Sequence, residues 1–191
     1  KIFIIINKNM IFLKKMFPKE NFIIQSQQLG TGHAIQTFLH KVKIKRNNKY
    51  LVLYGDNPLV TFSDLQSMYN KVKKNNLVLL GFKKNNNKSY GIIIGNKSGV
   101  KEIVEFKEAC EKQKKLKTCN SGIMAFDYSS LTLVKNISNK NKKKEYYLTD
   151  IVKLSWQSRL KINLVIAQNE KNAVGVNDQI ELLEAEKIMQ D

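Results

Sequence analysis

Cysteine is almost absent from this sequence, which contains only Cys110 and Cys119. The stretch between them is rich in Lys and Glu, and neither the paired spacing of a zinc site nor a framework of disulfides is present. The two histidines, His33 and His40, have no Cys or His cluster beside them. The sequence therefore predicts free thiols in a reducing compartment and no zinc site.

Long apolar runs are also lacking. The longest, such as residues 2–6, are far too short to cross a bilayer. No small-residue cleavage site follows them, which argues against a signal peptide. Hydrophobic residues nevertheless make up 42% of the 191 residues, which is enough for one domain with its own core. We therefore expect a single cytoplasmic domain over residues 1–191 that has no membrane partner.

Arginine is scarce, since Arg46 and Arg159 are the only two among 33 basic residues. The formal net charge of +17 allows a nucleic-acid binder. Specific readout of phosphates and bases, however, relies on the arginine fork, and the lysines gather in loops such as residues 139–144. We favour the lysine-rich composition of an A/T-rich genome over specific nucleic-acid binding. We expect the 139–144 loop to be exposed and dispensable for nucleotide binding.

Proline and glycine, which interrupt regular structure, number only 2 and 9. Between them, apolar runs typical of strands alternate with stretches of helical spacing. This alternation favours an α/β fold with one mixed, mostly parallel sheet and helices on both faces. A hairpin joined at residues 96–99 predicts one antiparallel insertion, and a polar turn is expected at residues 85–88. The predicted strands are residues 1–6, 22–25, 50–54, 77–82, 92–94, 100–106, 122–126 and 162–167.

Local signals indicate where helices begin. Gly30 and Gly32 break the chain just before a stripe of apolar residues at helical spacing, so a helix is expected there. Ser63, with Gln66 three residues later, has the pattern of a capping box. Asp178 stands where it would cap the last helix. Each of these positions predicts a helix start.

Ligands of α/β sheets bind beyond the carboxyl ends of the strands. The strand at residues 50–54 is predicted to be buried and ends in Tyr54-Gly55-Asp56. Gly55 would let the backbone approach a ligand, and Asp56 could hold a hard cation against phosphate oxygens. The alternative is a plain turn that stops the strand. The glycine-rich turn at residues 28–34 could likewise present N–H groups to an anion or a base edge, or be an ordinary helix start.

Three further polar residues stand at the ends of predicted elements. Glu105 at a strand end could accept hydrogen bonds from sugar hydroxyls, or be a solvated carboxylate. Asn120 and Asn177 precede a strand and a helix, where asparagine is also common in turns. Taken singly, none of these residues separates a site from a turn.

Taken together, seven motifs are more specific than any one of them. In chain order they are Gln-Leu-Gly-Thr-Gly-His-Ala from residue 28, Leu-Tyr-Gly-Asp-x-Pro-Leu from residue 53, Ser-Tyr-Gly-Ile from residue 89, Ile-Val-Glu-Phe-Lys-Glu-Ala from residue 103, Cys-Asn-Ser-Gly-Ile from residue 119, Glu-Tyr-Tyr-Leu-Thr-Asp from residue 145 and Val-Gly-Val-Asn from residue 174. This series resembles the uridyltransferase domain of the bacterial N-acetylglucosamine-1-phosphate uridyltransferase family, almost from end to end.

The resemblance implies a Rossmann-like nucleotide-diphospho-sugar transferase fold. It also implies transfer of a uridylyl group from UTP to N-acetylglucosamine 1-phosphate, which feeds peptidoglycan and lipopolysaccharide synthesis. The implied cofactor is Mg²⁺, held by Asp56 and Asn177 as the catalytic and metal-binding pair. The residues implied in substrate binding are Gln25, Gly30 and Thr31 at the uracil, Tyr54 and Gly55 along the site, and Gly91, Glu105 and Asn120 at the sugar.

The sequence also departs from that family. Its members begin with a strand that leads into a Gly-x-Gly-Thr-x-Met-type loop and a lysine, which grip the triphosphate. Residues 1–6 match a later strand, so we expect the first strand and its loop to be missing. Ile92 stands where these enzymes commonly carry arginine. The β-helix acetyltransferase domain of bifunctional members is not matched either.

The missing strand would lie inside the sheet of the family fold. Its loss would leave unpaired backbone groups that cost about 1–3 kcal/mol each, against a total domain stability of about 5–15 kcal/mol. We therefore expect residues 1–191 alone to be poorly folded and inactive, and a complementing chain that carries the glycine-rich loop to restore both properties. The alternatives are a non-catalytic remnant, the nucleotide-binding half of a split enzyme, or a transferase for another sugar phosphate.

Overall fold

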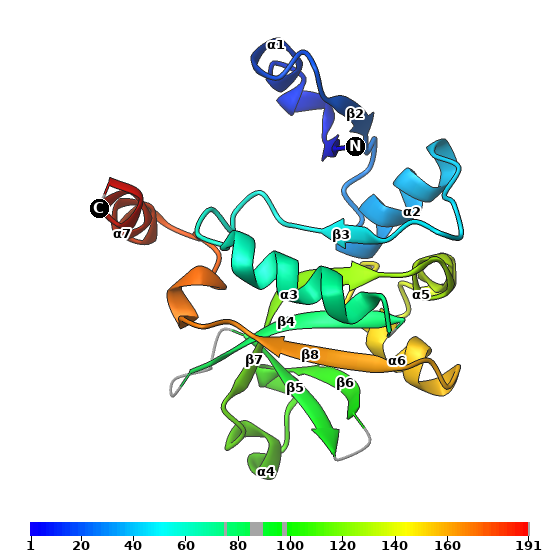
Figure 1. Ribbon diagram of the computed structural model, residues 1–191, viewed down its shortest axis with the longest axis vertical. Helices are drawn as coiled ribbons and strands as arrows, with labels where there is room; N and C mark the ends of the chain where they lie inside the picture. Colours follow the sequence, from blue (N-terminus) through cyan, green and yellow to red (C-terminus); the bar gives the residue numbers. More distant parts are fainter. Residues whose placement is uncertain (75, 85–89, 97–98, 191) are drawn as a thin grey trace.

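A computed structural model describes residues 1–74, 76–84, 90–96 and 99–190 (Figure 1). The turn expected at residues 85–88 and the centre of the turn at residues 96–99 lie outside this part. The strands are β1 (Phe3–Ile6), β2 (Asn21–Ile24), β3 (Tyr50–Val52), β4 (Leu77–Lys83), β5 (Gly91–Asn96), β6 (Gly99–Glu105), β7 (Thr118–Phe126) and β8 (Ile162–Ile166). The α-helices are α1 (Leu13–Met16), α2 (Thr31–Lys41), α3 (Phe62–Val72), α4 (Glu111–Lys114), α5 (Tyr128–Leu133), α6 (Asp150–Gln157) and α7 (Gln179–Gln190). Short 3₁₀ turns are η1 (Lys8–Met10), η2 (Phe106–Glu108), η3 (Val134–Asn136) and η4 (Glu170–Asn172).

The main sheet has six strands in the order β6-β5-β7-β4-β8, with β3 paired to β7 as well. The central strand β7 runs antiparallel to β3, β4 and β5, whereas β4 and β8 are parallel. Strands β3, β4, β5 and β8 therefore share one direction, and β6 and β7 run the other way. The mixed α/β fold is confirmed. The predicted hairpin is the β5–β6 pair, and β7 is a further antiparallel strand that the pattern did not predict.

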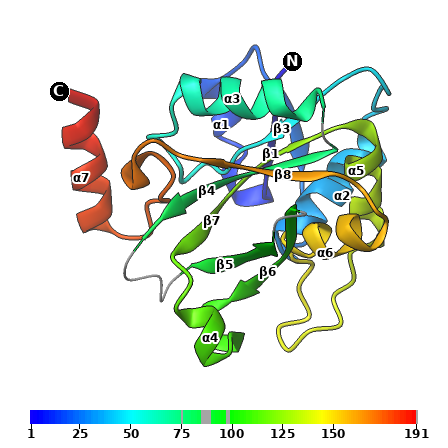
Figure 2. The same ribbon diagram turned by 60° about the horizontal axis from the view of Figure 1, so that its bottom comes forward.

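Both faces of this sheet are covered, as predicted. Successive side chains of a strand point to opposite faces, so Leu79 of β4 joins the core on one side and Val78 the core on the other. Helices α2, α5 and α6 cover the first side, and α3 covers the second (Figure 2). Each fully buried aliphatic side chain contributes about 1.5–3 kcal/mol. These two cores hold the strand ends, and hence the loops beyond them, in place.

Helix α3 starts earlier than its sequence pattern predicts. Thr61 caps it, because its hydroxyl accepts the Asp64 N–H at 3.2 Å, while Ser63 already lies in the first turn. The capping box at Ser63 is therefore wrong. The Asp178 cap of α7 is confirmed, because its Oδ1 accepts the Ile180 N–H at 2.9 Å.

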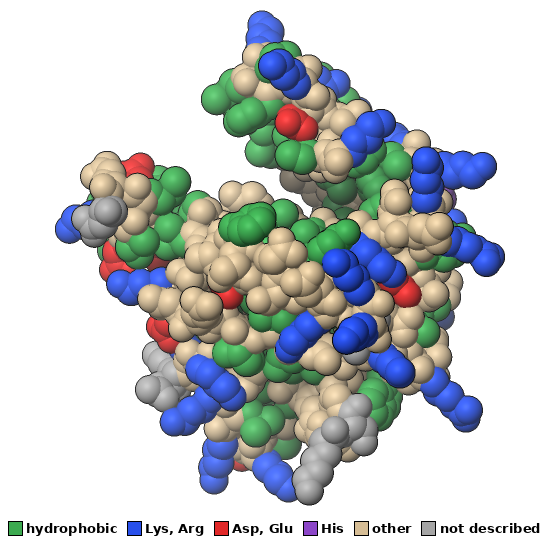
Figure 3. All heavy atoms as spheres, in the orientation of Figure 1, with side chains coloured by type: hydrophobic (Ala, Val, Ile, Leu, Met, Phe, Trp, Pro, Cys, Tyr) green, Lys and Arg blue, Asp and Glu red, His purple; other side chains and the backbone are tan. Residues whose placement is uncertain are grey.

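Strands β1 and β2 form a separate parallel pair, which together with η1 and α1 makes up what we call the N-terminal lobe, residues 1–24. In the described part of the chain, β1 pairs only with β2, and β3 pairs only with β7. Phe38 of α2 lies between them, with ring centroids 5.2 Å from Phe3 and 6.5 Å from Tyr50. Figure 3 shows a hollow between this lobe and the rest of the molecule.

The prediction of a buried strand at residues 50–54 is wrong. Strand β3 ends at Val52, and Leu51 and Leu53 are 37% and 46% exposed. The cause is its position, because β3 has one edge without a neighbouring strand among the described residues. An apolar edge strand of this kind is a template for pairing with another chain.

On the face shown in Figure 3, lysine and arginine side chains are spread over the surface and do not gather into one basic patch. In the loop at residues 139–144, Lys140 and the lysines at 142–144 are exposed, as expected. Within the described residues, no helix combines the length and the apolarity needed to cross a bilayer.

We expect the 191-residue chain to self-associate at high protein concentration through the open edge of β3. Leu51→Lys should lower the associated fraction several-fold in sedimentation velocity, because a charge on an edge strand opposes strand pairing. Leu183→Lys is the control, since Leu183 is 60% exposed on α7, away from that edge. An equal effect of both substitutions would show that association does not use β3.

Candidate functional site

Residues from distant parts of the chain surround one cavity of about 260 Å³, which we call the candidate site. Five of the residues singled out in the sequence line it, together with five others. The lining residues are Thr31, Tyr54, Tyr90, Gly91, Glu105, Asn120, Ser121, Gly122, Tyr147 and Thr149. The sheet topology explains this meeting, because the ends of β3, β5 and β6 and the bend of β7 lie around it.

The glycine-rich turn before α2 is held against the segment Tyr146–Leu148. The Tyr146 N–H donates to Leu29 O at 2.7 Å, and the Gly32 N–H donates to Tyr146 O at 2.8 Å. Gly30 has a φ of 103°, and a Cβ there would lie 2.6 Å from the Tyr146 carbonyl oxygen. Both the backbone angle and the close approach therefore require glycine. The Gly32 N–H is used within the protein, so it does not face an anion.

Thr31 and Gln25 are placed by the same turn. The Thr31 hydroxyl accepts the Leu148 N–H at 3.1 Å, and Thr31 lines the candidate site. The Gln25 Nε2 donates to Gly30 O at 3.2 Å and lies 2.9 Å from His33 Nδ1. Gln25 is thus bonded to Gly30, the residue before Thr31, and neither Gln25 nor Gly30 lines the cavity.

Tyr54 occupies the bend of β7. Gly122 has a φ of 86°, and a Cβ there would lie 2.3 Å from Cε2 of the Tyr54 ring. Gly122 therefore makes room for that ring. Burial raises the pKa of Tyr54, its hydrogen bond with the Thr31 side chain lowers the pKa, and the negative charge of Asp56 raises it again. The phenol thus stays neutral at physiological pH, when it can donate a hydrogen bond.

Three other lining residues, Gly91, Glu105 and Asn120, lie next to one another. Gly91 pairs with Glu105 across the β5–β6 hairpin, and a Cβ on Gly91 would lie 3.5 Å from Glu105 Oε1. Asn120 is 9% exposed, and its buried Oδ1 accepts no hydrogen bond. A buried acceptor without a donor is costly. This atom is therefore ready to accept a hydrogen bond from a ligand.

The carboxylate of Glu105 is disfavoured by its surroundings. Partial burial raises its pKa, the negative charge of Glu108 raises it further, and Lys143 lowers it. Burial likewise raises the pKa of Tyr147, on which Lys143 has the main opposing effect. The basic loop therefore acts electrostatically on the candidate site through Lys143.

Asp56 lies beside the segment that leads to Asn177. The Val176 N–H donates to Asp56 O at 2.7 Å, and a Cβ on Gly175 would lie 3.4 Å from Asp56 Oδ2. The Asn177 Nδ2 donates to Gly175 O and to Glu181 Oε2, at 3.1 Å each. Asp56, Gly55 and Asn177 are not among the residues that line the cavity. The structure thus brings the loop of Asp56 next to the segment of Asn177, outside the lining.

The chemistry of this second group suits a hard cation. Asp56 offers a carboxylate and Asn177 an amide oxygen, and the buried Oδ1 of Asn57 beside them has no hydrogen-bond partner. Oxygen ligands of this kind are those of Mg²⁺, which uses one or two carboxylates and keeps waters or substrate phosphates. No cluster of three or more His, Cys, Asp or Glu side chains that could bind a metal occurs among the described residues. The residues present therefore fit Mg²⁺ shared with a phosphate ligand.

Sequence reasoning assigned no role to five lining residues. Tyr147 and Thr149 belong to the motif at residues 145–150, and Ser121 and Gly122 belong to the motif at residues 119–123. The fifth, Tyr90, precedes Gly91. Their signal was present in motifs already noted, but only the folded chain shows which side chains face the cavity. Ile92, where arginine was expected, is fully buried and pairs with Val104.

Comparisons with known proteins identify the family of this chain. The sequence pattern of the family described as nucleotidyl transferase matches residues 4–179. The chain is 37% identical over 174 residues to the bifunctional protein GlmU of Vesicomyosocius okutanii, covering 91% of this chain and 38% of that protein. It is 39% identical over 178 residues to the bifunctional protein GlmU of Campylobacter jejuni, covering 92% of this chain and 40% of that protein. The chain thus spans about two fifths of the length of these relatives.

Solved structures share the fold at low sequence identity. A nucleoside-diphosphate-sugar pyrophosphorylase from Vibrio cholerae superposes with a TM-score of 0.68 at 13% identity, over 97% of this chain and 80% of that one. A CMP:2-keto-3-deoxy-manno-octonic acid synthetase complexed with CTP gives 0.65 at 11% identity, over 100% of this chain and 80% of that one. These similarities concern the fold alone, and they confirm its Rossmann-like class.

We expect Gly30→Ala to destabilise the fold by about 1–3 kcal/mol, because it combines a strained backbone with a clash against the Tyr146 carbonyl. Urea unfolding measures this change. Gly55→Ala is the matched control, because a Cβ there meets nothing within 4 Å. Gly55→Ala should leave stability unchanged or raise it by up to about 1 kcal/mol. Similar losses in both variants would contradict the role given to the Gly30–Tyr146 contact.

We expect Glu105→Gln to raise the free energy of unfolding at neutral pH. The pKa of Glu105 is higher in the folded state than its ordinary value of 4.5. The folded protein therefore binds this proton more tightly than the unfolded chain. The wild type loses stability as pH rises from the ordinary pKa to the higher pKa of the folded state. The gain should vanish at pH values below about 4, where both states are protonated. Urea unfolding at several pH values tests this, and a gain independent of pH would contradict it.

Proposed function

Since this chain belongs to the nucleotidyl transferase family, we propose that it forms the uridylyl-transfer site for UTP and N-acetylglucosamine 1-phosphate. The observation that carries the proposal is the meeting of Thr31, Tyr54, Gly91, Glu105 and Asn120 around one cavity. The similarity to bifunctional GlmU proteins over about nine tenths of this chain supports it.

The reaction joins a phosphate oxygen of the sugar phosphate to the α-phosphorus of UTP. The bond from that phosphorus to the bridging oxygen breaks, and pyrophosphate leaves with the bonding electrons. Such chemistry depends on alignment and charge neutralisation more than on an acid and a base. The chain supplies alignment through the Asn120 Oδ1, which can accept a sugar N–H or O–H, and through Glu105, which can accept from sugar hydroxyls.

In this proposal Thr31 and Tyr54 lie on the nucleotide side of the cavity. They are fixed to each other by their side-chain hydrogen bond and to the body by Leu148. Gln25 and Gly30, which do not line the cavity, would support the contact of Thr31 with the uracil, and Gly55 would stand next to Tyr54 along the site. Asp56 and Asn177 would hold Mg²⁺, which when bound neutralises charge on the phosphate oxygens.

A second candidate is the nucleotide-binding half of a split enzyme. Strands β1 and β3 each lack a neighbour on one side among the described residues, which leaves edges that another strand could join. In that case a complementing chain would bring the glycine-rich loop and its lysine to the site. The first candidate requires the same segment in the same polypeptide.

The experiment measures pyrophosphate release from UTP and N-acetylglucosamine 1-phosphate while Mg²⁺ is varied. We expect turnover only when a strand, glycine-rich loop and lysine are supplied, either fused before residue 1 or as a second chain. Asn120→Ala should then lower kcat/KM by about tenfold to a hundredfold, because one polar contact with the substrate is lost. Asn70→Ala on the surface of α3 should leave kcat/KM unchanged.

Replacing the sugar phosphate by glucose 1-phosphate or galactose 1-phosphate tests the acetamido preference. A higher rate with either would assign the chain to another sugar. A well-folded, complemented protein that releases no pyrophosphate with any of the three would contradict uridylyl transfer and favour a non-catalytic remnant.

A further inference from the structure

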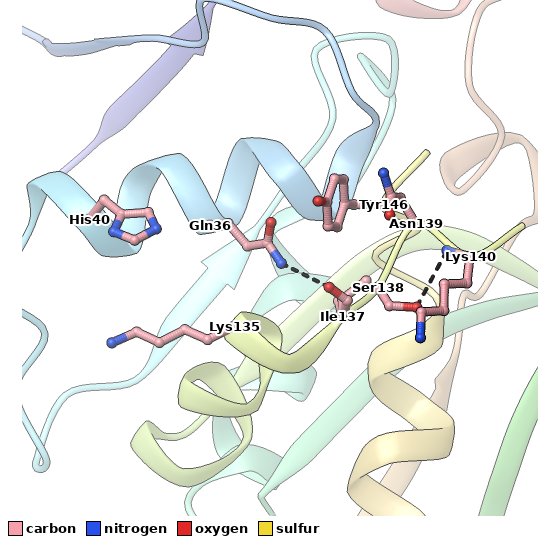
Figure 4. A pocket seen from close by; sticks show the side chains of 8 residues that line it. All are labelled: Gln36, His40, Lys135, Ile137, Ser138, Asn139, Lys140 and Tyr146. Carbon is pink, nitrogen blue, oxygen red and sulfur yellow. Dashed lines mark hydrogen bonds between the residues drawn. The ribbon is translucent and has the colours of Figure 1, made fainter. Parts of the chain in front are cut away.

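Outside the candidate site, a larger cavity of about 410 Å³ opens between α2 and the segment that follows α5 (Figure 4). Its two lysines, Lys135 and Lys140, point to opposite ends and so cannot hold one anion together. These two charges therefore do not converge on a ligand. Polar groups do converge at the start of α7, where the carboxylate of Glu181 meets both the backbone and the side chain of Asn177.

Glu181 is turned back toward Asn177 by the way in which α7 begins. Asp178 caps this helix, because its Oδ1 accepts the N–H groups of Ile180 and Glu181 at 2.9 Å each. Glu181 thus stands three residues after the cap, the position from which the Glu of a capping box reaches back to the start of the helix. Its Oε2 accepts the backbone N–H of Asn177 at 2.7 Å. This bond alone is explained by the helix start.

The same carboxylate oxygen makes a second bond that a helix start does not require. Glu181 Oε2 accepts from Asn177 Nδ2 at 3.1 Å, and the carbonyl oxygen of Gly175 accepts from Nδ2 at the same distance. The two hydrogens of an amide nitrogen suffice for both bonds. An ionised carboxylate and a carbonyl oxygen can only accept, so the amide cannot exchange its nitrogen and oxygen without losing both bonds. Oδ1 is therefore the atom of Asn177 that is left for a ligand.

The amide held in this way lies next to the loop of Asp56. The Val176 N–H donates to Asp56 O at 2.7 Å, and a Cβ on Gly175 would lie 3.4 Å from Asp56 Oδ2. Gly175 thus stands beside the Asp56 carboxylate and holds the Asn177 amide through its own carbonyl oxygen. Whatever orients Asn177 therefore orients one of the two groups proposed to hold Mg²⁺.

Glu181 also lies near the candidate site. Tyr90 lines that cavity, and burial raises the pKa of Tyr90 while the negative charge of Glu181 raises it further. The Glu181 side chain is itself only partly exposed. The start of α7 is thus close to the cavity as well as to Asp56.

We propose that Glu181 is a positioning residue, which holds the amide of Asn177 so that Oδ1 stays available to Mg²⁺ bound with the phosphates of the nucleotide. The proposal rests on the proposed function, in which Asn177 is a metal ligand. Hydrogen-bond partners behind a metal ligand fix its orientation and thereby raise the affinity for the metal. Glu181 acts through Asn177, because its Oε2 is already bonded to that residue twice.

The affinity for uridine 5′-triphosphate, measured by calorimetry with Mg²⁺ and with EDTA, tests this role in the chain complemented as in the transfer assay. The ratio of the two affinities is the gain due to the metal. We expect Glu181→Ala to lower this gain by about threefold or more. Glu181→Gln should keep most of it, because its amide oxygen can still accept from Asn177. Glu184→Ala, which removes an exposed charge three residues further along the same helix, should equal the wild type.

The outcomes separate this role from the proposed function. An equal loss in Glu181→Ala and Glu181→Gln would show that the charge of Glu181 acts on the metal directly, and would overturn the positioning role. An unchanged gain in Glu181→Ala would overturn it as well. A wild type whose affinity is the same with Mg²⁺ and with EDTA would instead contradict the metal pair of the proposed function, and the role of Glu181 would fall with it.

Nuclear magnetic resonance tests the orientation itself, without metal or nucleotide. We expect ¹⁵N relaxation to show an ordered Asn177 side-chain amide in the wild type and in Glu181→Gln, and a more mobile one in Glu181→Ala. The side-chain amide of Asn70, exposed on α3, is the control and should be the same in all three proteins. Equal order of the Asn177 amide in the wild type and in Glu181→Ala would overturn the positioning role even if the metal gain falls.

Discussion

Hydrogen bonds between Leu29–Gly32 and Tyr146–Leu148 connect the start of α2 to the part of the molecule that contains the main sheet. Strands β1 and β2 of the N-terminal lobe are not paired with that sheet in the described residues. The N-terminal lobe has no strand hydrogen-bonded to the main sheet among the described residues, so α2 is its principal attachment. The close approach is possible because residues 30 and 32 have no side chains. Gln36 and Phe38 then continue the contact along the same helix, one by hydrogen bonds and the other by packing. Everything N-terminal to β3 takes its position from this helix.

Strand β7 fixes the positions of the other strands whose ends surround the site. It contacts β3 and β4 with its second half and β4 and β5 with its first, so one strand sets the relative positions of three others. The change of partner occurs around Gly122, whose left-handed backbone turns the strand and admits the Tyr54 ring. Asn120 stands just before this bend. The site is therefore formed where the sheet changes partners, in keeping with the way α/β sheets bind ligands at breaks in strand order.

Alternating apolar runs were sufficient to predict the fold class, the β5–β6 hairpin and the position of α2. The reason is that buried strands and helices each require their own characteristic spacing of apolar residues. They were not sufficient to predict that β7 is antiparallel or that Leu51 and Leu53 are exposed. Both facts depend on which strands become neighbours, and an apolar run is the same whether its edges are paired or open. For the site, the motifs singled out Thr31, Tyr54 and Asn120, and the folded chain brings all three to one cavity. The motif at residues 145–150 did not predict that Tyr147 lines this cavity and Tyr146 does not, because that depends on how the segment packs in the folded chain.

The surplus of lysine has a consequence for the behaviour of the chain in solution. A net charge of +17 makes copies of the molecule repel one another at a distance, and added salt screens this repulsion within about a Debye length. Contact between open strand edges requires that this barrier be crossed first. These charges thus oppose aggregation, and the ionic strength of the solution sets how long an uncovered strand edge stays apart from another.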